Sequence, residues 1–444
     1  MKKLRFAFIL IAGLFFFTII IASSVRNIYL SSDAGKGRLG FMANPIKFLA
    51  ETPSLMKQIV APPEFLFKNS KSKDGFTYFD EKTSHSYPSL LVGYKTEKYG
   101  SKFDLLDINT GKVLKNWSPD NETLFQQAFN DDNPRKPPSE QSDLYYLHPL
   151  MLKDSSLLIT AQLTSLLAKI DVNNKVLWLK NDRTYHHSLE LDEDGNVFSC
   201  TRPFESAQYD FLPTDYDLYK NTLVDDHITQ LNPDTGDILF DKSVIAVLLE
   251  NGYEKVLLGK GQITSDLTHL NDIQPALSSS EYWQKGDLLI SCRNLSTVFL
   301  YRPSTNKILW LKTSPWYNQH DVDFYEQDKI VVFGNDDIRE ESKEIASVGN
   351  QNLFFSNKRS HNEVYVYNFV TDSISTPFTQ LLKEEEISTL TSGRCDILSN
   401  GDIFVEDTNH GRIIIGDSIA KKIEYVKRHD KDNISSLYWS RIVN

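Results

Sequence analysis

Two short stretches of the chain repeat one pattern, and each opens with a histidine. One begins at His187 and reads HSLELDEDGNVF, and the other begins at His320 and reads HDVDFYEQDKIV. In both, alternating apolar residues lead into a turn, and a second apolar strand follows. Side chains of a strand alternate between two faces. A repeat that keeps a histidine at one register therefore predicts that these histidines share one surface.

A second repeated element is a strand–turn–strand with Asn, Thr, Asp or Gly in the turn, as a tight hairpin requires. It occurs clearly at Asp107–Leu114, Asp171–Trp178, Leu231–Phe240 and Tyr301–Trp310, and more weakly at Tyr367–Ser375 and Gly416–Tyr425. These hairpins alternate with strands of the histidine type, whose starts lie near Tyr87, His148, His187, His269, His320 and Arg394.

Six such pairs predict an all-β fold, a six-bladed β-propeller, with seven blades as the alternative. A solenoid is the rival architecture, but its repeats would be more uniform in length. The first strand of each propeller blade lines the central channel, so the residues that open these strands converge at one mouth. We therefore expect His148, His187, His269, His320 and Arg394 around a single funnel.

A ring of imidazoles and a guanidinium suits an anion with several oxygens, because these groups donate hydrogen bonds. For any single histidine, the alternative is a turn or core residue whose hydrogen bonds are satisfied within the fold. Next to His320, Asp321 either caps a turn or holds the second ring nitrogen of His320 in one tautomer.

The N-terminus predicts export. Lys2, Lys3 and Arg5 precede an apolar run from Phe6 to Ala22. We expect a signal anchor or transmembrane helix over residues 1–27, with the rest of the chain on the periplasmic or extracytoplasmic side. An uncleaved anchor is favoured because no small-x-small cleavage site follows the apolar run. A stalk over 28–82 and the propeller over 83–444 complete the expected domains.

Composition limits the partners and cofactors. The net charge of -11 argues against a nucleic-acid partner. Cys200, Cys292 and Cys395 are too few for a disulfide framework. Because the sequence has no zinc pattern and no cluster typical of a quinone or divalent-cation site, we expect neither a metal nor a cofactor.

Three short motifs carry a resemblance to a known family. They are His269-Leu-Asn-Asp, Leu289-Ile-Ser-Cys-Arg-Asn and Gln319-His-Asp. With them, the sequence resembles the bacterial arylsulfate sulfotransferase (ASST-type) family from about Tyr145 to Asp336, and more loosely in the last blade. The resemblance implies PAPS-independent transfer of a sulfuryl group from an aryl sulfate donor to a phenolic acceptor through a sulfohistidine.

The resemblance also implies roles for individual residues. His320 matches the family's nucleophile, and His269, Asn271 and Arg293 match its sulfuryl-oxygen binders.

Other matches are looser. His187 matches a further catalytic-site histidine, although the adjacent His186 is an alternative match. Arg394 falls where the family has a lysine, and His148 joins the substrate-binding set by register alone.

The chain also departs from the family. It lacks a close cysteine pair, and residues 28–82 are too short for the N-terminal β-domain that the soluble enzymes use to dimerise, so no oligomeric state is predicted. The runner-up function is a non-catalytic, quinoprotein-like propeller that acts as a scaffold or binding module at the membrane. A third reading is a family member that has lost transfer and keeps only anion or aromatic binding.

Overall fold

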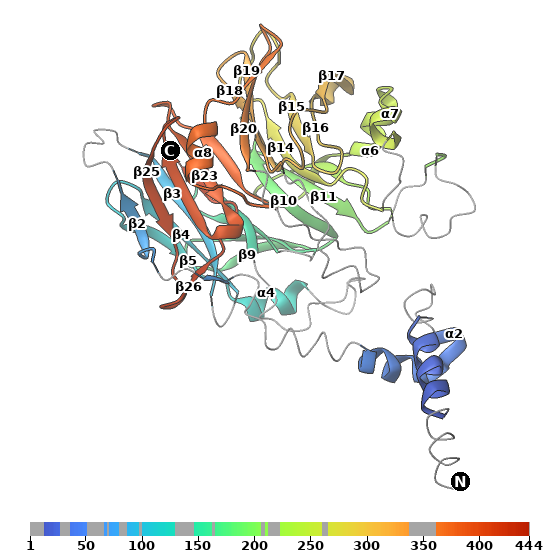
Figure 1. Cartoon of the computed structure of the whole chain (residues 1–444). Helices are drawn as coiled ribbons and strands as arrows, with labels where there is room; N and C mark the ends of the chain where they lie inside the picture. The colour runs from blue at the N-terminus through green and yellow to red at the C-terminus, as the bar shows by residue number, and fades with distance from the viewer. Residues whose placement is uncertain are drawn as a thin grey trace. The chain divides into compact units, whose positions relative to one another are not determined.

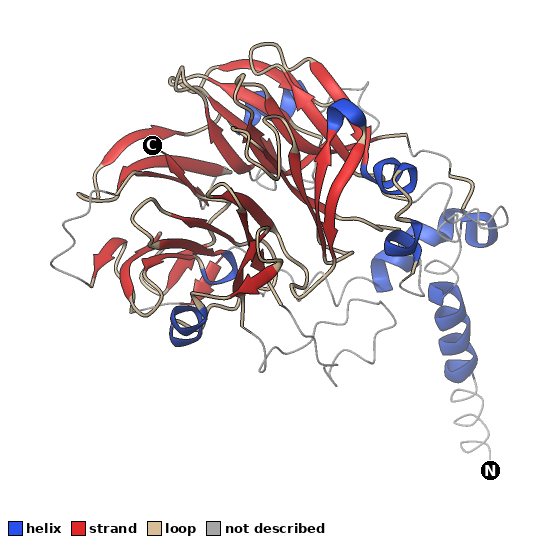
Figure 2. Ribbon diagram, turned by 90° about the horizontal axis from the view of Figure 1, so that it is seen from above, coloured by secondary structure: helices blue, strands red, loops and turns tan. Residues whose placement is uncertain are grey.

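The computed structural model describes most of the chain. Its described residues are 13–26, 36–50, 66–68, 71–79, 87–96, 100–128, 146–161, 165–205, 209–211, 223–259, 265–336 and 361–443. They form two compact units, Met1–Glu64 and Phe65–Asn444. The second unit holds the repeats and consists mainly of antiparallel strands (Figure 2).

The larger unit is a six-bladed β-propeller, as the repeats predict. Its first blade joins β27 (Arg441–Val443), β3 (Ser89–Lys95), β4 (Ser101–Asp107) and β5 (Val113–Trp117). The second joins β6 (Tyr146–Met151), β7 (Leu157–Ala161), β8 (Leu167–Ile170) and β9 (Val176–Lys180). The third joins β10 (Arg183–Leu191), β11 (Val197–Pro203), β12 (His227–Leu231) and β13 (Ile238–Ser243).

The other three blades follow in chain order. The fourth joins β14 (Leu270–Pro275), β15 (Leu288–Cys292), β16 (Thr297–Arg302) and β17 (Lys307–Lys312). The fifth joins β18 (Asp321–Tyr325), β19 (Lys329–Gly334), β20 (Glu363–Asn368) and β21 (Ser373–Ser375). The sixth joins β22 (Arg394–Ile397), β23 (Ile403–Asp407), β24 (Arg412–Gly416), β25 (Lys421–Val426) and β2 (Gly75–Tyr78).

Short helices connect some of these strands. They are α4 (Asn121–Ala128), α6 (Val244–Glu250), α7 (Glu254–Leu258) and α8 (Thr379–Glu384). The predicted turns close the third and fourth strands of each blade, and the first four lie between β4 and β5, β8 and β9, β12 and β13, and β16 and β17. Apolar clusters fill the spaces between blades, and the largest joins buried residues of the third and fourth blades.

Both ends of the unit take part in closing the ring. The red strand β25 lies beside the blue strand β2 in Figure 1, and Gly75 pairs with Val426. At the C-terminus, β27 pairs with β3 and takes the place that the first strand has in other blades. The sequence predicts that the first strand of the first blade starts near Tyr87. This expectation is wrong, because the C-terminal strand β27 is the first strand of that blade. The expected stalk, residues 28–82, contains β2 and β1 (Leu66–Lys68), and β1 pairs with β26 (Asn433–Ser435).

The N-terminal unit contains helical residues 13–26, α2 (Lys36–Leu39) and helical residues 43–50. None of the helices in the described part of the chain has the length and apolarity needed to cross a membrane. Residues 1–12, which begin the expected anchor, lie outside the described residues. The anchor therefore stays a prediction.

Buried carboxylates bond to the backbone of the next blade around the ring. Asp226 accepts the backbone N–H of Leu270 at 2.8 Å, so it joins the third blade to the fourth. In the same way, Asp272 of the fourth blade accepts the backbone N–H of Val322 in the fifth. Asp321 of the fifth blade accepts that of Cys395 in the sixth. Glu406 of the sixth blade accepts the N–H groups of Trp439 and Ser440, which lead into β27.

Replacing Glu406 with alanine is expected to weaken this closure. Glu406 is fully buried and also accepts the hydroxyl of Thr408, so its loss leaves two buried N–H groups without their acceptor. We expect the free energy of unfolding to fall by about 3–5 kcal/mol, measured by denaturant titration of the full chain. The exposed Glu384→Ala is the control. A loss at Glu406 no larger than that of the control would contradict the closing role.

Candidate active site

Three of the expected site histidines share an uncommon backbone conformation. His148, His187 and His269 have φ values of 50°, 53° and 49°, in the left-handed region that few non-glycine residues adopt. Pairing between the first and second strands shifts register around His148 and His187, and directly after His269. His148 and His187 lie inside β6 and β10, so the expectation that they open these strands is wrong. The register shifts interrupt the regular alternation of the strands.

The four histidines of the second to fifth blades lie in one cluster around His187. The ring centroid of His187 is 5.9 Å from that of His148, 5.2 Å from His269 and 6.3 Å from His320. These separations leave the rings close enough to contact one small ligand together. The structure therefore brings together the four histidines that the register placed at one mouth.

Hydrogen bonds fix the ring of His320 in one tautomer. Its Nδ1 is 2.6 Å from Oδ1 of Asn335 and 3.1 Å from the carbonyl oxygen of Asn318. The amide nitrogen of Asn335 donates to the carbonyl oxygens of Thr389 and Ser392, which turns Oδ1 toward the imidazole. Because both acceptors require a proton on Nδ1, Nε2 keeps its lone pair.

Asp321 does not hold the imidazole. Its carboxylate accepts the backbone N–H of Cys395 at 2.8 Å, in the next blade. Neighbouring side chains of a strand point to opposite faces, which turns Asp321 away from His320. Both roles expected for Asp321 are therefore wrong, because it neither caps a turn of its own blade nor contacts the imidazole.

Burial keeps three of the clustered imidazoles neutral, those of His148, His187 and His320. Burial, followed by the positive charge of Arg293, lowers the pKa of His320 to about 3. Burial also lowers the pKa of His187 and that of His148 well below the ordinary value. At neutral pH these rings therefore carry a nucleophilic lone pair and no charge.

Arg293 and His269 are tied together beside this cluster. The backbone N–H of Arg293 donates to the carbonyl oxygen of His269 at 2.9 Å, and its Nη1 donates to Asn294. Nδ1 of His269 lies 2.5 Å from Oδ2 of Asp266. The fourth blade thus supplies the cation of Arg293 and the oriented imidazole of His269, from residues whose backbones are hydrogen-bonded to each other.

His186 lies behind His187, away from the other rings of the cluster. Its Nδ1 is 2.6 Å from Nδ1 of His187, and its Nε2 is 3.3 Å from Asp226. Among the described contacts, it is His187 that meets His148, His269 and His320. The geometry therefore favours His187 over His186 as the residue that faces the site.

Two of the expected substrate contacts are engaged within the protein. The side chain of Arg394 lies 3.0 Å from Asp396 and 3.9 Å from Asp321, and its guanidinium packs over the ring of Trp439. Asn271 is fully buried, and its amide nitrogen donates to the carbonyl oxygen of Gln319. A role for either residue in holding substrate stays a prediction.

Comparison with known proteins identifies the family. The sequence profile described as Arylsulfotransferase (ASST) matches residues 148–425, which is more than half of the chain and includes all four clustered histidines. The chain belongs to the arylsulfotransferase (ASST) family. This confirms the resemblance carried by the three motifs. None of the curated proteins compared with the chain matches it.

Solved structures share only a general likeness with this arylsulfotransferase-family chain. A protein of unknown function from Bacteroides caccae is 10% identical, with a TM-score of 0.42, and the match covers 74% of this chain and 90% of that one. The Kuenenia stuttgartiensis hydrazine synthase is 9% identical, with a TM-score of 0.37 and coverage of 76% and 79%. At these values, neither carries an argument about the activity of the chain.

Two residues at the cluster of this family member were not assigned a role from the sequence. Asn335 follows β19, which pairs with β18 so that Phe333 lies opposite Asp321. That register places Asn335 near His320. The two strands form a hairpin that the sequence predicts, so pairing them in this register could have identified Asn335. Trp439 packs on His148 with a centroid distance of 4.7 Å, but it comes from the C-terminal segment that the repeats did not include.

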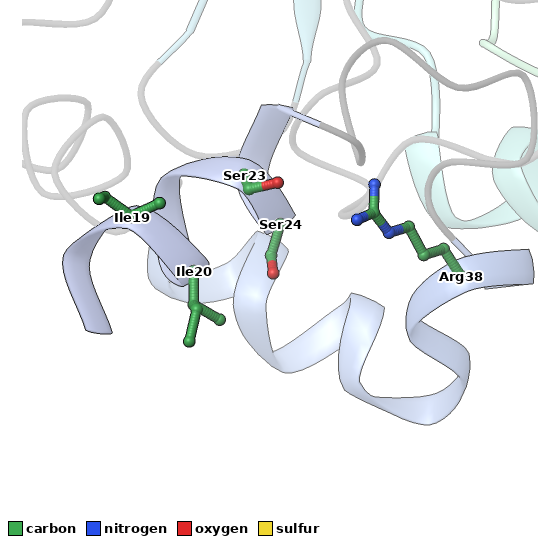
Figure 3. Close-up of a pocket in the computed structure, with 5 residues that line it drawn as sticks. All are labelled: Ile19, Ile20, Ser23, Ser24 and Arg38. Atoms are coloured by element: carbon green, nitrogen blue, oxygen red, sulfur yellow. The ribbon is translucent and has the colours of Figure 1, made fainter. Parts of the chain in front are cut away.

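The N-terminal unit has a pocket of its own (Figure 3). Ile19, Ile20, Ser23, Ser24 and Arg38 line it, and the figure shows Ser24 and Arg38 on separate helical segments. These residues supply no imidazole, thiol or carboxylate. Within the described part of the chain, no group of three or more histidine, cysteine or acidic side chains is arranged to hold a metal ion.

Asp336 is expected to make stability depend on pH. Burial raises the pKa of Asp336 to about 7, although Tyr317 and Tyr365 donate hydrogen bonds to its carboxylate. In the unfolded chain the group titrates near 3.9, so the folded state binds more protons between about pH 4 and about pH 7. The contribution of this carboxyl to stability therefore falls as the pH rises through that window.

Asp336→Asn removes this titration while it keeps an oxygen acceptor. We compare the unfolding free energy of the variant with that of the wild type at each pH. This difference is expected to be more favourable to the variant at pH 8 than at pH 4, by about 2–4 kcal/mol. Denaturant unfolding at a series of pH values measures the difference, with the exposed Asp432→Asn as control. Parallel stability curves for the variant and the wild type would refute the assignment.

Proposed function

We propose that the chain transfers a sulfuryl group from an aryl sulfate donor to a phenolic acceptor, with His320 as the nucleophile. The observation that carries the proposal is the single tautomer of His320, which leaves the lone pair on Nε2, on a ring within 6.3 Å of that of His187. Membership of the arylsulfotransferase family supports the reaction class. No PAPS and no metal takes part in the proposed reaction.

In the first half of the reaction, Nε2 of His320 attacks the sulfur of the donor. The nitrogen–sulfur bond forms as the bond from sulfur to the phenolic oxygen breaks, and the electron pair leaves with the phenolate. The proton on Nδ1 stays on the ring and keeps its bond to Asn335, which spreads the positive charge that develops on the imidazole.

In the second half, the oxygen of an acceptor phenol attacks the same sulfur and His320 leaves. Charge develops on the sulfuryl oxygens in both halves, where a guanidinium and ring N–H groups stabilise it. Arg293 is the candidate for this task, because its positive charge lowers the pKa of His320. His269 is fixed to the same residue through the backbone.

We also propose that residues 1–27 anchor the protein in the membrane, with the propeller on the periplasmic side. The basic start and the apolar run from Phe6 to Ala22 support this arrangement. After expression in bacteria, the full chain is expected to stay in the membrane fraction at high salt, with the propeller open to protease added to spheroplasts. Release of the protein as a soluble species, or protection of the propeller from the protease, would contradict the arrangement.

His320→Ala is expected to abolish transfer from 4-nitrophenyl sulfate to phenol, because the variant has no nucleophile. Release of 4-nitrophenol measures turnover, and the wild type is expected to show a rapid burst when the acceptor is withheld. His410→Ala, which replaces a half-exposed ring bonded to Asp407, is the control that should keep the activity. A wild type without turnover on a panel of donors and acceptors would favour the runner-up, a non-catalytic scaffold.

A companion pair of variants tests the orientation of the nucleophile. Asn335→Ala removes the acceptor of the Nδ1 proton, and we expect kcat to fall about 10–100-fold with little change in KM. Asn335→Asp keeps an oxygen acceptor at the ring and is expected to recover part of this loss. Equal losses in both variants would indicate a structural role for the amide.

A further inference from the structure

His186 and His187 are consecutive, yet their side chains touch. In a regular strand, neighbouring side chains point to opposite faces. Here His187 has a left-handed backbone, and the pairing of β10 with β11 shifts between His186 and Leu189. The two rings therefore meet edge to face, with an interplanar angle of 86° and 2.6 Å between their Nδ1 atoms.

A buried carboxylate lies on the far side of His186. Nε2 of His186 is 3.3 Å from Oδ1 of Asp226, which is fully buried. Asp226 also accepts hydrogen bonds from Arg202 at 2.6 Å and from Thr268 at 2.7 Å. Burial acts to raise the pKa of Asp226, but the Arg202 cation and the hydrogen bonds hold it well below its usual range. The carboxylate is therefore ionised and acts only as a hydrogen-bond acceptor.

This order of groups determines where each ring proton sits. Nε2 of His186 makes no hydrogen bond, but the ionised carboxylate of Asp226 lies 3.3 Å from it. That negative charge favours the ring proton of His186 on Nε2 and leaves a lone pair on its Nδ1. The short contact between the two Nδ1 atoms then requires the proton of His187 on Nδ1. As a result, Nε2 of His187 carries a lone pair, and the His187 ring lies between those of His148, His269 and His320.

We propose that Asp226 and His186 form a relay that makes His187 the general base for the acceptor phenol. His186 is then a positioning residue and not a substrate contact. The inference rests on the proposed function, because it assigns a role within the second half of that reaction. A carboxylate behind an imidazole that fixes its tautomer is a recurrent arrangement in catalysis, and here a second imidazole stands between the two.

In the proposed step, the phenol proton passes to Nε2 of His187 as the phenolic oxygen bonds to sulfur. The bond between sulfur and Nε2 of His320 breaks, and its electron pair returns to that nitrogen. The resulting imidazolium of His187 is stabilised because its Nδ1 proton points to His186, which in turn faces Asp226. The proton then leaves to solvent or to the phenolate released in the first half.

The test separates the two half-reactions in the full chain. In His186→Phe, we expect the burst of 4-nitrophenol from 4-nitrophenyl sulfate to stay close to the wild-type rate, because this leaving group needs no proton. Transfer from the sulfurylated enzyme to phenol should slow about 10–100-fold, without a matching rise in KM for phenol. His186→Asn, whose amide oxygen can accept the Nδ1 proton of His187, should recover part of the rate.

His227→Phe is the matched control in the same blade. His227 is a largely buried histidine that pairs with Asp225 and Asp241, so its loss should lower stability without changing the ratio of the two rates. Equal slowing of both half-reactions in His186→Phe, or an unchanged transfer to phenol, would overturn the relay. Absence of any burst in the wild type would instead refute the proposed function, so the two failures are distinguishable.

Discussion

The arrangement of the site depends on buried carboxylates that bond to the backbone of the next blade. Four carboxylates each accept an N–H group of the next blade around the ring, on its innermost strand or directly before that strand: Asp226, Asp272, Asp321 and Glu406. Arg441 completes the set, since its guanidinium donates to carbonyl oxygens and to a carboxylate of the second and third blades. A buried carboxylate is costly unless it is hydrogen-bonded, so each contact strongly favours one spacing of neighbouring blades. These contacts position the innermost strands that carry or directly follow the clustered histidines.

Burial of the histidines inside the propeller determines their charge and so their reactivity. Histidines that are removed from water lose their charge, and the pKa of His320 falls to about 3. The hydrogen bond from Nδ1 to Asn335 then decides which nitrogen is nucleophilic. A site with protonated rings would bind an anion more strongly but could not attack its sulfur. The balance between the cation of Arg293 and the neutral rings is what a transfer through a covalent intermediate requires.

Much of the fold could be predicted from the sequence, because hairpin turns and strand alternation are local signals. The shared register of His148, His187, His269 and His320 was sufficient to place them together. What the sequence could not provide was the ring closure, since the packing of Trp439 on His148 joins residues from opposite ends of the propeller.

The orientation of the rings could not be predicted from local sequence patterns either. Asp321 adjoins His320 in sequence, but alternation turns it toward the next blade, and Asn335 takes the orienting role across the hairpin. Likewise, the shift of register at His187 brings His186 against it, which a regular strand would forbid. In the proposed reaction, His320 carries the sulfuryl group between donor and acceptor. Peptide mass mapping of enzyme quenched after reaction with 4-nitrophenyl sulfate tests this role. We expect one added SO₃ on the peptide that contains His320, and a label on the peptide that contains His187 would contradict the assignment.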